Sequence, residues 1–197
     1  MNLKNINIGF AITGAFYSFE NIIPILKQLR KEEANIIPLM SKNSYKINKN
    51  LGKSNEFVER IENITNNRII NTIEEAEKIG RKKLTDILVV VPCTGNTLGK
   101  ISNGIYDGPI TVAVKSHLRN SNPVVIGIAT NDGLSGSAEN IGRLLNRTNY
   151  YFVPFRQDNP ITKPRSIIFD KTYVIKTIKS ALQKEQIQPI LLWLLNI

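Results

Sequence analysis

Short apolar runs alternate along the chain with segments whose apolar residues recur at helical spacing. Asp86–Pro92 and Pro123–Ala129 are continuous aliphatic runs, typical of strands buried on both faces of a parallel sheet. Ile6–Thr13, Asn35–Met40 and Tyr150–Phe155 predict three further strands. The repeated alternation of strands and helices favours an α/β fold, a three-layer, doubly wound parallel sheet with helices on both faces.

Helices are predicted between these strands and after the last one. They cover Ser18–Leu29, Phe57–Ile64, Thr72–Ile79, Thr94–Tyr106, Pro109–Leu118, Ile141–Leu145 and Tyr173–Gln186. Thr72 and Glu75 have the spacing of a capping box, and Pro109 suits a first helical position. Residues 41–55 and Arg156–Ser166 are predicted to be loops, the second because it holds two prolines. We expect residues 1–197 to form a single domain that closes with a helix and tail from about residue 170.

Composition narrows the class of protein. Hydrophobic residues make up 42% and charged residues 21%, as in an ordinary globular protein. A single cysteine, Cys93, and a single histidine, His117, exclude a disulfide framework, a zinc site of several cysteines and a multi-histidine metal site. The N-terminal sequence lacks the pattern of a signal peptide, and no apolar stretch has the length of a membrane span. We therefore expect a cytoplasmic protein with no metal and no membrane partner.

The chain is basic, with 26 Lys and Arg against 16 Asp and Glu and a formal net charge of +10. The basic residues form small scattered groups with few aromatic residues among them, so dedicated nucleic-acid binding is not expected. Solvated surface explains much of this excess, and attraction of an anionic small ligand is the other interpretation.

Polar segments with small residues follow three of the predicted strands. They are Thr13–Ser18, Thr94–Thr97 and Thr130–Gly133. Each by itself is also explained as a tight turn or a helix cap. The carboxyl ends of parallel strands, however, meet at one edge of a sheet, where such folds bind ligands and helix entrances favour anions. Asn96 supplies the donors and acceptors that hold the amide edge of a heterocycle. Since the glycine spacing of a dinucleotide fingerprint is absent, the sequence predicts a planar ligand with one phosphate group.

The segment after the third strand also carries a motif. Residues 92–97, P-C-T-G-N-T, resemble the P-A-S-A-N-T signature of the flavoprotein family, which includes homo-oligomeric flavin-containing cysteine decarboxylases and flavin prenyltransferases. The match is at Pro92, Asn96 and Thr97. Residues 97–107 are similar to the T-x-x-K-x-x-x-G-x-x-D pattern that follows in the family.

This resemblance implies a flavodoxin-like or Rossmann-like flavoprotein fold that binds FMN, and homo-oligomers built from trimers. The positions that it assigns to FMN are Thr13, Gly14, Ala15 and Ser18 at the phosphate with Ser41 nearby, Thr94, Gly95, Asn96 and Thr97 beside the ring, and Thr130 and Asn131 from the fourth strand. Asn96 is the candidate for a catalytic residue.

Within the family the resemblance extends over essentially the whole chain to one branch. Its members oxidise a dihydrodipicolinate-level intermediate to pyridine-2,6-dicarboxylate as the B subunit of a two-subunit enzyme, in the mother cell of a sporulating bacterium. The resemblance therefore implies a partner A subunit that binds NAD(P). A dicarboxylate substrate needs cations to orient it. The candidates are Lys42, Lys115, Arg119, Arg143 and Arg156.

Some residues depart from the family pattern. The family decarboxylases carry a catalytic histidine in the first half of the chain, whereas Ser54–Arg60 holds none. His117 is expected to be solvated or to cap a helix, and Cys93 to be a buried small side chain rather than a nucleophile. Ala129–Asp132 replaces the family's P-A-M-N motif, so decarboxylation of a cysteine substrate is not predicted. The alternatives are an independent FMN enzyme related to the decarboxylases or prenyltransferases, and a non-catalytic subunit that keeps the fold without flavin.

Overall fold

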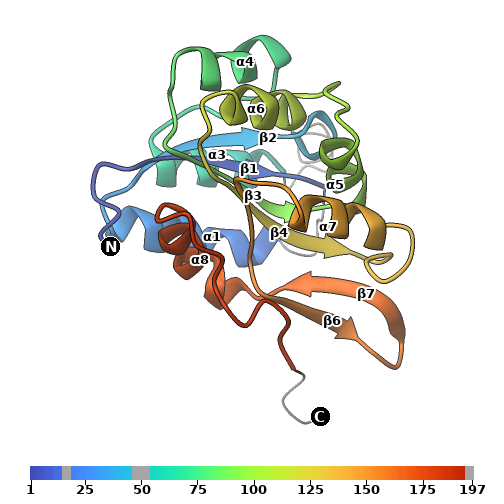
Figure 1. Ribbon diagram of the computed structural model, residues 1–197. Coiled ribbons are helices and arrows are strands. Elements are labelled where there is room, and N and C mark those ends of the chain that lie inside the picture. The colour runs from blue at the N-terminus through green and yellow to red at the C-terminus, as the bar shows by residue number, and fades with distance from the viewer. Residues whose placement is uncertain (15–18, 46–53, 194–197) are drawn as a thin grey trace.

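The computed structural model describes residues 1–14, 19–45 and 54–193, and a seven-stranded sheet forms the centre of the molecule (Figure 1). The strands are β1 (Asn7–Ile12), β2 (Asn35–Met40), β3 (Ile87–Cys93), β4 (Val124–Thr130), β5 (Tyr150–Phe152), β6 (Phe155–Asn159) and β7 (Lys163–Phe169). Their order is β2-β1-β3-β4-β7-β6, and β5 pairs with the first half of β4. Strands β1 to β5 run parallel, whereas β7 is antiparallel to β4. The predicted doubly wound α/β sheet is confirmed, although it is only mostly parallel.

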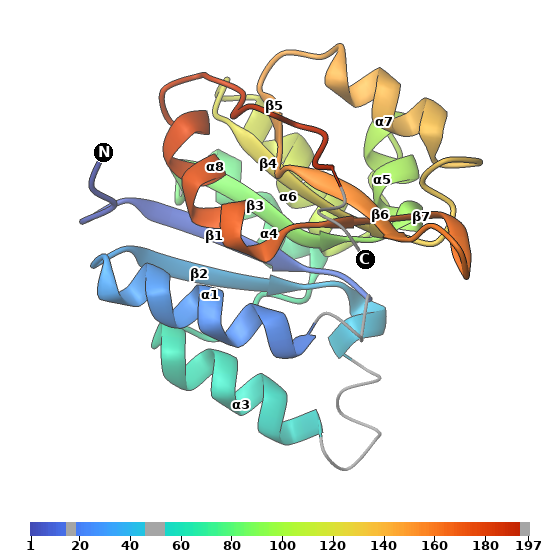
Figure 2. The same ribbon diagram turned by 90° about the horizontal axis from the view of Figure 1, so that it is seen from below.

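Helices cover both faces of the sheet (Figures 1 and 2). One face carries α1 (Phe19–Lys31), α3 (Ser54–Thr65) and α8 (Val174–Ala181), and the other carries α4 (Ile73–Arg81), α5 (Gly95–Ser102), α6 (Pro109–Leu118) and α7 (Ala138–Leu145). A short 3₁₀ helix, η2 (Lys171–Tyr173), leads into α8. Among the helices that the structure describes, none is long and apolar enough to cross a membrane.

The alternation of side chains along the central strands builds a separate core on each face. In β3, Ile87, Val89 and Val91 belong to the core under α1, α3 and α8. Leu88 and Val90 belong to the core under α4 to α7. All five are fully buried. Because both faces are covered, the strand is apolar at every position, which is why a continuous aliphatic run marks it in the sequence.

Two helices begin at the positions that their sequence signals predict. The Thr72 hydroxyl accepts a hydrogen bond from the backbone N–H of Glu75 at 3.2 Å and opens α4. Pro109 is the first residue of α6. Both predictions are confirmed. The backbone N–H groups of the first helical turn have no partner within the helix, so a side-chain acceptor such as that of Thr72 satisfies one of them. Proline at the first position lacks an N–H that would otherwise need such a partner.

The prediction of a loop over Arg156–Ser166 is wrong. Most of this segment forms the antiparallel hairpin of β6 and β7. Pro160 lies in the hairpin turn, where the Asn159 side-chain oxygen accepts backbone N–H groups at 3.0 and 2.8 Å. Pro164 lies at the start of β7, next to the turn. Proline is tolerated at the end of an edge hairpin, where its missing N–H costs little, so the prolines here mark a turn rather than a loop.

Helix α5 is shorter than predicted because a Schellman motif ends it. Gly104 adopts a left-handed conformation with φ +70° and donates its N–H to the Ile101 carbonyl oxygen at 3.3 Å. The N–H of Ile105 donates to the Lys100 carbonyl oxygen at 2.9 Å. This reversal is the usual way a helix stops at glycine, and it brings Asp107 back toward Lys100.

Three smaller differences concern other elements. β5 ends at Phe152 and α8 at Ala181, so both are shorter than predicted. Residues 42–45 form a helical turn inside the predicted loop of residues 41–55. The predicted helix cap, Ser18, lies outside the described residues.

Candidate functional site

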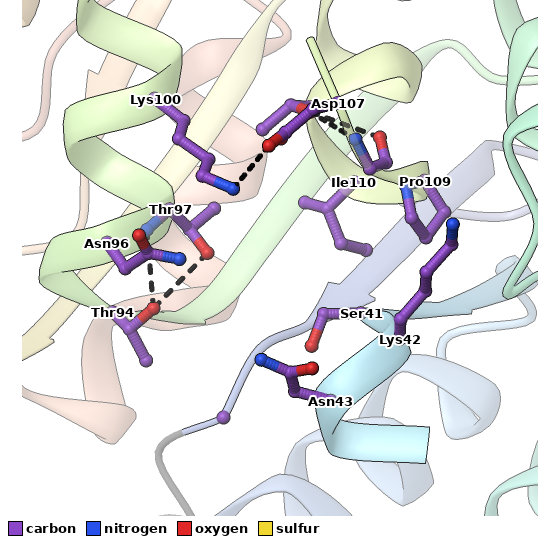
Figure 3. Close-up of a pocket in the computed structure, with 13 residues that line it drawn as sticks. Ser41, Lys42, Asn43, Thr94, Asn96, Thr97, Lys100, Asp107, Pro109 and Ile110 are labelled. Carbon is purple, nitrogen blue, oxygen red and sulfur yellow. Dashed lines mark hydrogen bonds and ion pairs between the residues drawn. The ribbon is translucent and has the colours of Figure 1, made fainter. Parts of the chain in front are cut away.

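Four segments meet at the carboxyl edge of the sheet around a cavity of about 420 Å³ (Figure 3). Gly14 follows β1, Ser41–Asn43 follow β2, and residues 94–100 belong to the end of β3 and to α5. Asp107–Thr111, at the start of α6, form the opposite wall. Open α/β sheets bind ligands at this edge, and the volume lies in the range of small-molecule sites.

Asn96 and Thr97 present the polar groups of α5 to the cavity. The Asn96 side chain is exposed, and no described residue forms a hydrogen bond with its amide. Both its donor and its acceptor are therefore available to a ligand. Thr94 caps the helix, because its hydroxyl accepts from the Thr97 N–H at 3.4 Å and donates to the Thr97 hydroxyl at 3.2 Å.

Thr13 positions this helix entrance instead of lining the cavity. It is 1% exposed, and its hydroxyl donates to the Pro92 carbonyl oxygen at 2.8 Å. The Thr13 hydroxyl oxygen in turn accepts the backbone N–H of Thr94 at 3.0 Å. The residue therefore ties the end of β1 to the end of β3 and holds Thr94 in place. Ala15 and Ser18, which were expected at a phosphate, lie outside the described residues.

Lys100 and Asp107 form an ion pair across the cavity wall, with 2.7 Å between Nζ and Oδ2. The hydrogen bond from Lys100 lowers the pKa of the Asp107 carboxyl from its ordinary value, against a weaker effect of desolvation. The positive charge of Lys100 is thus compensated. Neither residue was singled out as a site residue from the sequence, although the T-x-x-K-x-x-x-G-x-x-D spacing contains both.

Neither Thr130 nor Asn131 lines the cavity: Thr130 lies against the start of α5, whereas Asn131 is exposed and its side-chain oxygen accepts from the Ser166 hydroxyl of β7 at 3.4 Å. The hydroxyls of Thr130 and Ser137 both donate to Asp132 Oδ1, the second at 2.9 Å. These hydrogen bonds, that of Thr130 foremost, lower the pKa of the Asp132 carboxyl although burial opposes them. A Cβ on Gly95 would lie 2.6 to 2.9 Å from oxygen atoms of all three side chains. Glycine at this position therefore lets the start of α5 approach the end of β4 and the segment that follows it, residues 130–137 (the β4 loop).

The five predicted cations occupy different places. Lys42 lines the cavity, and no described residue forms an ion pair with it. Lys115 lies over the Tyr106 ring, 4.8 Å from its centroid, and Arg143 pairs with Glu139 on α7. Neither Lys115 nor Arg143 lines the cavity.

Arg119 and Arg156 are far apart in the fold. Arg119 follows α6 at the end opposite to the cavity, since the preceding His117 contacts Pro123 at the start of β4. Arg156, on β6, forms a 2.6 Å ion pair with Asp170 and lines a second cavity. Of the five predicted cations, only Lys42 lines the same cavity as Asn96, on the opposite wall (Figure 3).

Comparison with known proteins decides the family. Residues 1–172 match the family model described as Flavoprotein. The chain belongs to the flavoprotein family. Across 190 residues this flavoprotein is 38% identical to the dipicolinate synthase B subunit of Bacillus subtilis (strain 168), and the match covers 96% of this chain and 95% of that protein. The resemblance inferred from residues 92–107 is thereby confirmed.

Solved structures agree with this assignment. The crystal structure of the dipicolinate synthase B subunit from Bacillus halodurans matches with a TM-score of 0.91 and 35% identity, over 98% of this chain and 99% of that one. An FMN-dependent cysteine decarboxylase, SpaF, matches with a TM-score of 0.67 and 21% identity, over 89% and 99% of the two chains. The second likeness concerns the fold alone.

The single cysteine and the single histidine of this flavoprotein, Cys93 and His117, are fully buried, and neither lines the cavity. Burial raises the pKa of the Cys93 thiol, which keeps it protonated and supports its role as a small apolar side chain. His117 is fully buried between Thr85 and Pro123, at 3.0 Å from each. The expectation of a solvated His117 is therefore wrong, because α6 directs the ring into the space between the starts of β3 and β4. Within residues 1–14, 19–45 and 54–193, no three His, Cys, Asp or Glu side chains gather in a group that could hold a metal ion.

Proposed function

We propose that this flavoprotein is the B subunit of a dipicolinate synthase. Together with an A subunit it oxidises a dihydrodipicolinate-level intermediate to pyridine-2,6-dicarboxylate during sporulation. The observation that carries this proposal is the 38% identity to the Bacillus subtilis protein across nearly the full length of both chains. The TM-score of 0.91 to the Bacillus halodurans protein supports it independently.

The cofactor in this proposal is FMN, held at the carboxyl edge of the sheet. The described part of the cavity fits a flavin: Asn96 offers an amide that no described residue engages, Ser41 and Thr97 line the same space, and Lys42 supplies a positive charge. The residues proposed to hold FMN are Thr13, Gly14, Ala15, Ser18, Ser41, Thr94, Gly95, Asn96, Thr97, Thr130 and Asn131. Of these, Thr13 acts through Thr94 and Thr130 acts by shaping the start of α5, whereas Asn131 lies outside the cavity, next to Ser166. Bound FMN would accept the reducing equivalents that leave the substrate.

Asn96 is the proposed catalytic residue, because its amide faces the cavity at the end of the central strand and forms no hydrogen bond with the described residues. This amide can orient a flavin or the ring of the substrate by hydrogen bonds without transferring a proton. Formation of an aromatic ring supplies driving force, so no strong base is required. This fits a cavity whose one described carboxylate, that of Asp107, is paired with Lys100.

The proposal also includes a partner and an assembly. NAD(P) is assigned to the A subunit, as the family resemblance implies, and the lack of a dinucleotide fingerprint after the first strand of this chain is consistent with that. The chain forms homo-oligomers based on trimers and works in the cytoplasm of the mother cell. Lys115, Arg119 and Arg143 line neither cavity, so in this proposal they contact the substrate only where two subunits meet.

Two experiments test the proposal. The purified chain is mixed with an A subunit, NAD(P) and the dihydro substrate, and the dicarboxylate product is measured by chromatography. Product that depends on both subunits is expected. Product from this chain alone would indicate an independent FMN enzyme, and no product from the pair would refute the synthase assignment.

The second experiment is a titration with FMN followed by the flavin absorbance. Asn96→Ala should weaken binding about tenfold, the effect of losing hydrogen bonds worth about 1.4 kcal/mol. Asn146→Ala is the matched control, because Asn146 is an exposed asparagine at the end of α7, outside the cavity. A colourless chain that takes up no FMN would instead support a subunit that keeps the fold without flavin.

A further inference from the structure

A second cavity, of about 330 Å³, lies where the first turn of α1 approaches β6, the end of β7 and η2. Three segments far apart in the sequence build it. Asn21 comes from the first turn of α1, Arg156 from β6, and Ile168–Thr172 from the end of β7 and from η2. None of these residues lines the cavity around Asn96. The volume suits a small ligand.

Asp170 is the one carboxylate among the described residues that line this cavity, and its hydrogen-bonding capacity is used within the protein. Oδ1 accepts the backbone N–H of Thr172 at 2.9 Å and the Thr172 hydroxyl at 2.6 Å, while Oδ2 accepts from Arg156 Nη1 at 2.6 Å. Partial burial acts to raise the pKa of Asp170, but these hydrogen bonds outweigh it and the pKa lies below its ordinary value. Asp170 is therefore ionised, and its role is to fix the Arg156 guanidinium.

Arg156 and Lys171 line the cavity, and both have N–H donors that form no hydrogen bond with the described residues. Arg156 has five N–H groups, of which one is bonded to Asp170. Lys171 donates to the neutral side-chain oxygen of Asn21 at 2.9 Å, and no described carboxylate pairs with it. The lining thus carries two positive charges and one negative charge. Lys171 is exposed, whereas the Arg156 side chain is 36% exposed and that of Asp170 19%, so an anion at Arg156 would be screened less than at an open surface.

Apolar atoms complete the wall. Phe169 is almost fully buried, and Ile168 is half-buried and also lines the cavity. Positioned cations beside an apolar wall are suited to an organic anion, in which a charged group is attached to a carbon framework. An inorganic ion would gain nothing from Ile168 and Phe169.

We propose that this second cavity is a carboxylate-binding site, in which Arg156 and Lys171 bind a carboxylate group and Ile168 and Phe169 contact the carbon ring that carries it. The identity of the ligand as the ring dicarboxylate of the synthase reaction rests on the proposed function. The site itself rests on the four side chains and does not depend on FMN.

The test is calorimetric titration of the full chain with pyridine-2,6-dicarboxylate, with pyridine-2-carboxylate and with inorganic phosphate. We expect the dicarboxylate to bind and Lys171→Met to weaken it about tenfold, the loss of one charge-assisted hydrogen bond. Lys176→Met is the matched control, because Lys176 is an exposed lysine of α8 that lies over Tyr173, outside the cavity. It should bind the dicarboxylate as the wild type does.

A second variant, Arg156→Lys, tests the site without depending on Lys171→Met alone, which could lose binding through a folding defect. Arg156→Lys keeps a positive charge next to Asp170, so the chain should fold, but it loses the planar donor set and should also weaken binding. Equal affinity in wild type, Lys171→Met and Arg156→Lys would overturn the proposal. Phosphate that binds as tightly as the dicarboxylate, with the same dependence on Lys171, would overturn it too, because the site would then be one for phosphate.

Failure of this site and failure of the proposed function give different results. If the pair of subunits makes product and Lys171→Met changes neither dicarboxylate binding nor KM, only the second site is refuted. If the pair makes no product but Lys171→Met still weakens dicarboxylate binding, only the synthase assignment is refuted.

Discussion

Acidification is expected to destabilise this flavoprotein through its one histidine. The His117 ring is fully buried, with Nδ1 3.0 Å from the Thr85 hydroxyl and Nε2 3.0 Å from the Pro123 carbonyl oxygen. A neutral ring satisfies both contacts, because Nε2–H donates to the carbonyl oxygen and Nδ1 accepts from the hydroxyl. Desolvation is the main cause that lowers the pKa of His117 from its ordinary value of 6.5 to about 4, against the opposing hydrogen bond to Pro123.

The magnitude follows from linkage between protonation and folding. Between pH 6.5 and 4 the unfolded chain binds a proton at His117 and the folded chain does not. The free energy of unfolding therefore has its full value above pH 6.5 and falls as the pH drops toward 4. With about 1.4 kcal/mol per pKa unit, the free energy of unfolding falls by about 2 kcal/mol at pH 5 and by about 3 kcal/mol at pH 4. The pKa values of Asp107, Asp132 and Asp170 are lowered from their ordinary value of 3.8. These carboxylates therefore titrate below the range from pH 6.5 to 4 and do not contribute to this change.

The assay is urea unfolding followed by circular dichroism at pH 7 and pH 5, for the wild type and for His117→Gln. The variant loses stability at pH 7, because a buried hydrogen-bonding group is replaced, but it should lack the fall of about 2 kcal/mol between the two pH values. An equal fall in both proteins would refute the reasoning. It would mean that other groups carry the acid sensitivity and that the folded protein tolerates a charged His117.

Two further predictions concern the entrance of α5. Gly95→Ala should lower the free energy of unfolding by about 1–3 kcal/mol and weaken FMN binding, because the new Cβ lies 2.6 Å from the nearest oxygen of the β4 loop. Gly142→Ala is the control with open space around its Cβ, and it should leave FMN binding unchanged; unchanged stability in Gly95→Ala would contradict the close approach. Thr94→Ala and Thr72→Ala each remove a helix cap and should each cost about 1 kcal/mol in urea unfolding. Only Thr94→Ala should reduce FMN affinity in the absorbance titration. Equal FMN affinity in the two variants would show that Thr94 does not contribute to FMN binding.

Much of the fold could be predicted because burial on both faces leaves a strong local signal. β3 and β4 are aliphatic at nearly every position, and β2 has the predicted bounds of Asn35–Met40. The β6–β7 hairpin could not be predicted in this way. Its residues are mostly polar and half-buried or exposed, since the hairpin is at the edge of the sheet, and its prolines resemble those of a loop.

The sequence by itself determined the family, the order of the helices and of the five parallel strands along the chain, and the polar segments at the carboxyl edge. These properties are local, because caps, aliphatic runs and the motif of residues 92–107 depend on neighbours along the chain. Only the tertiary structure decided which cations lie together. Lys42 lines the same cavity as Asn96, Arg156 and Lys171 line a second cavity, and Arg119 lies at the opposite edge of the sheet. The physical reason is that a charged side chain on a surface segment has no preferred partner until long-range packing of helices against the sheet brings distant segments together.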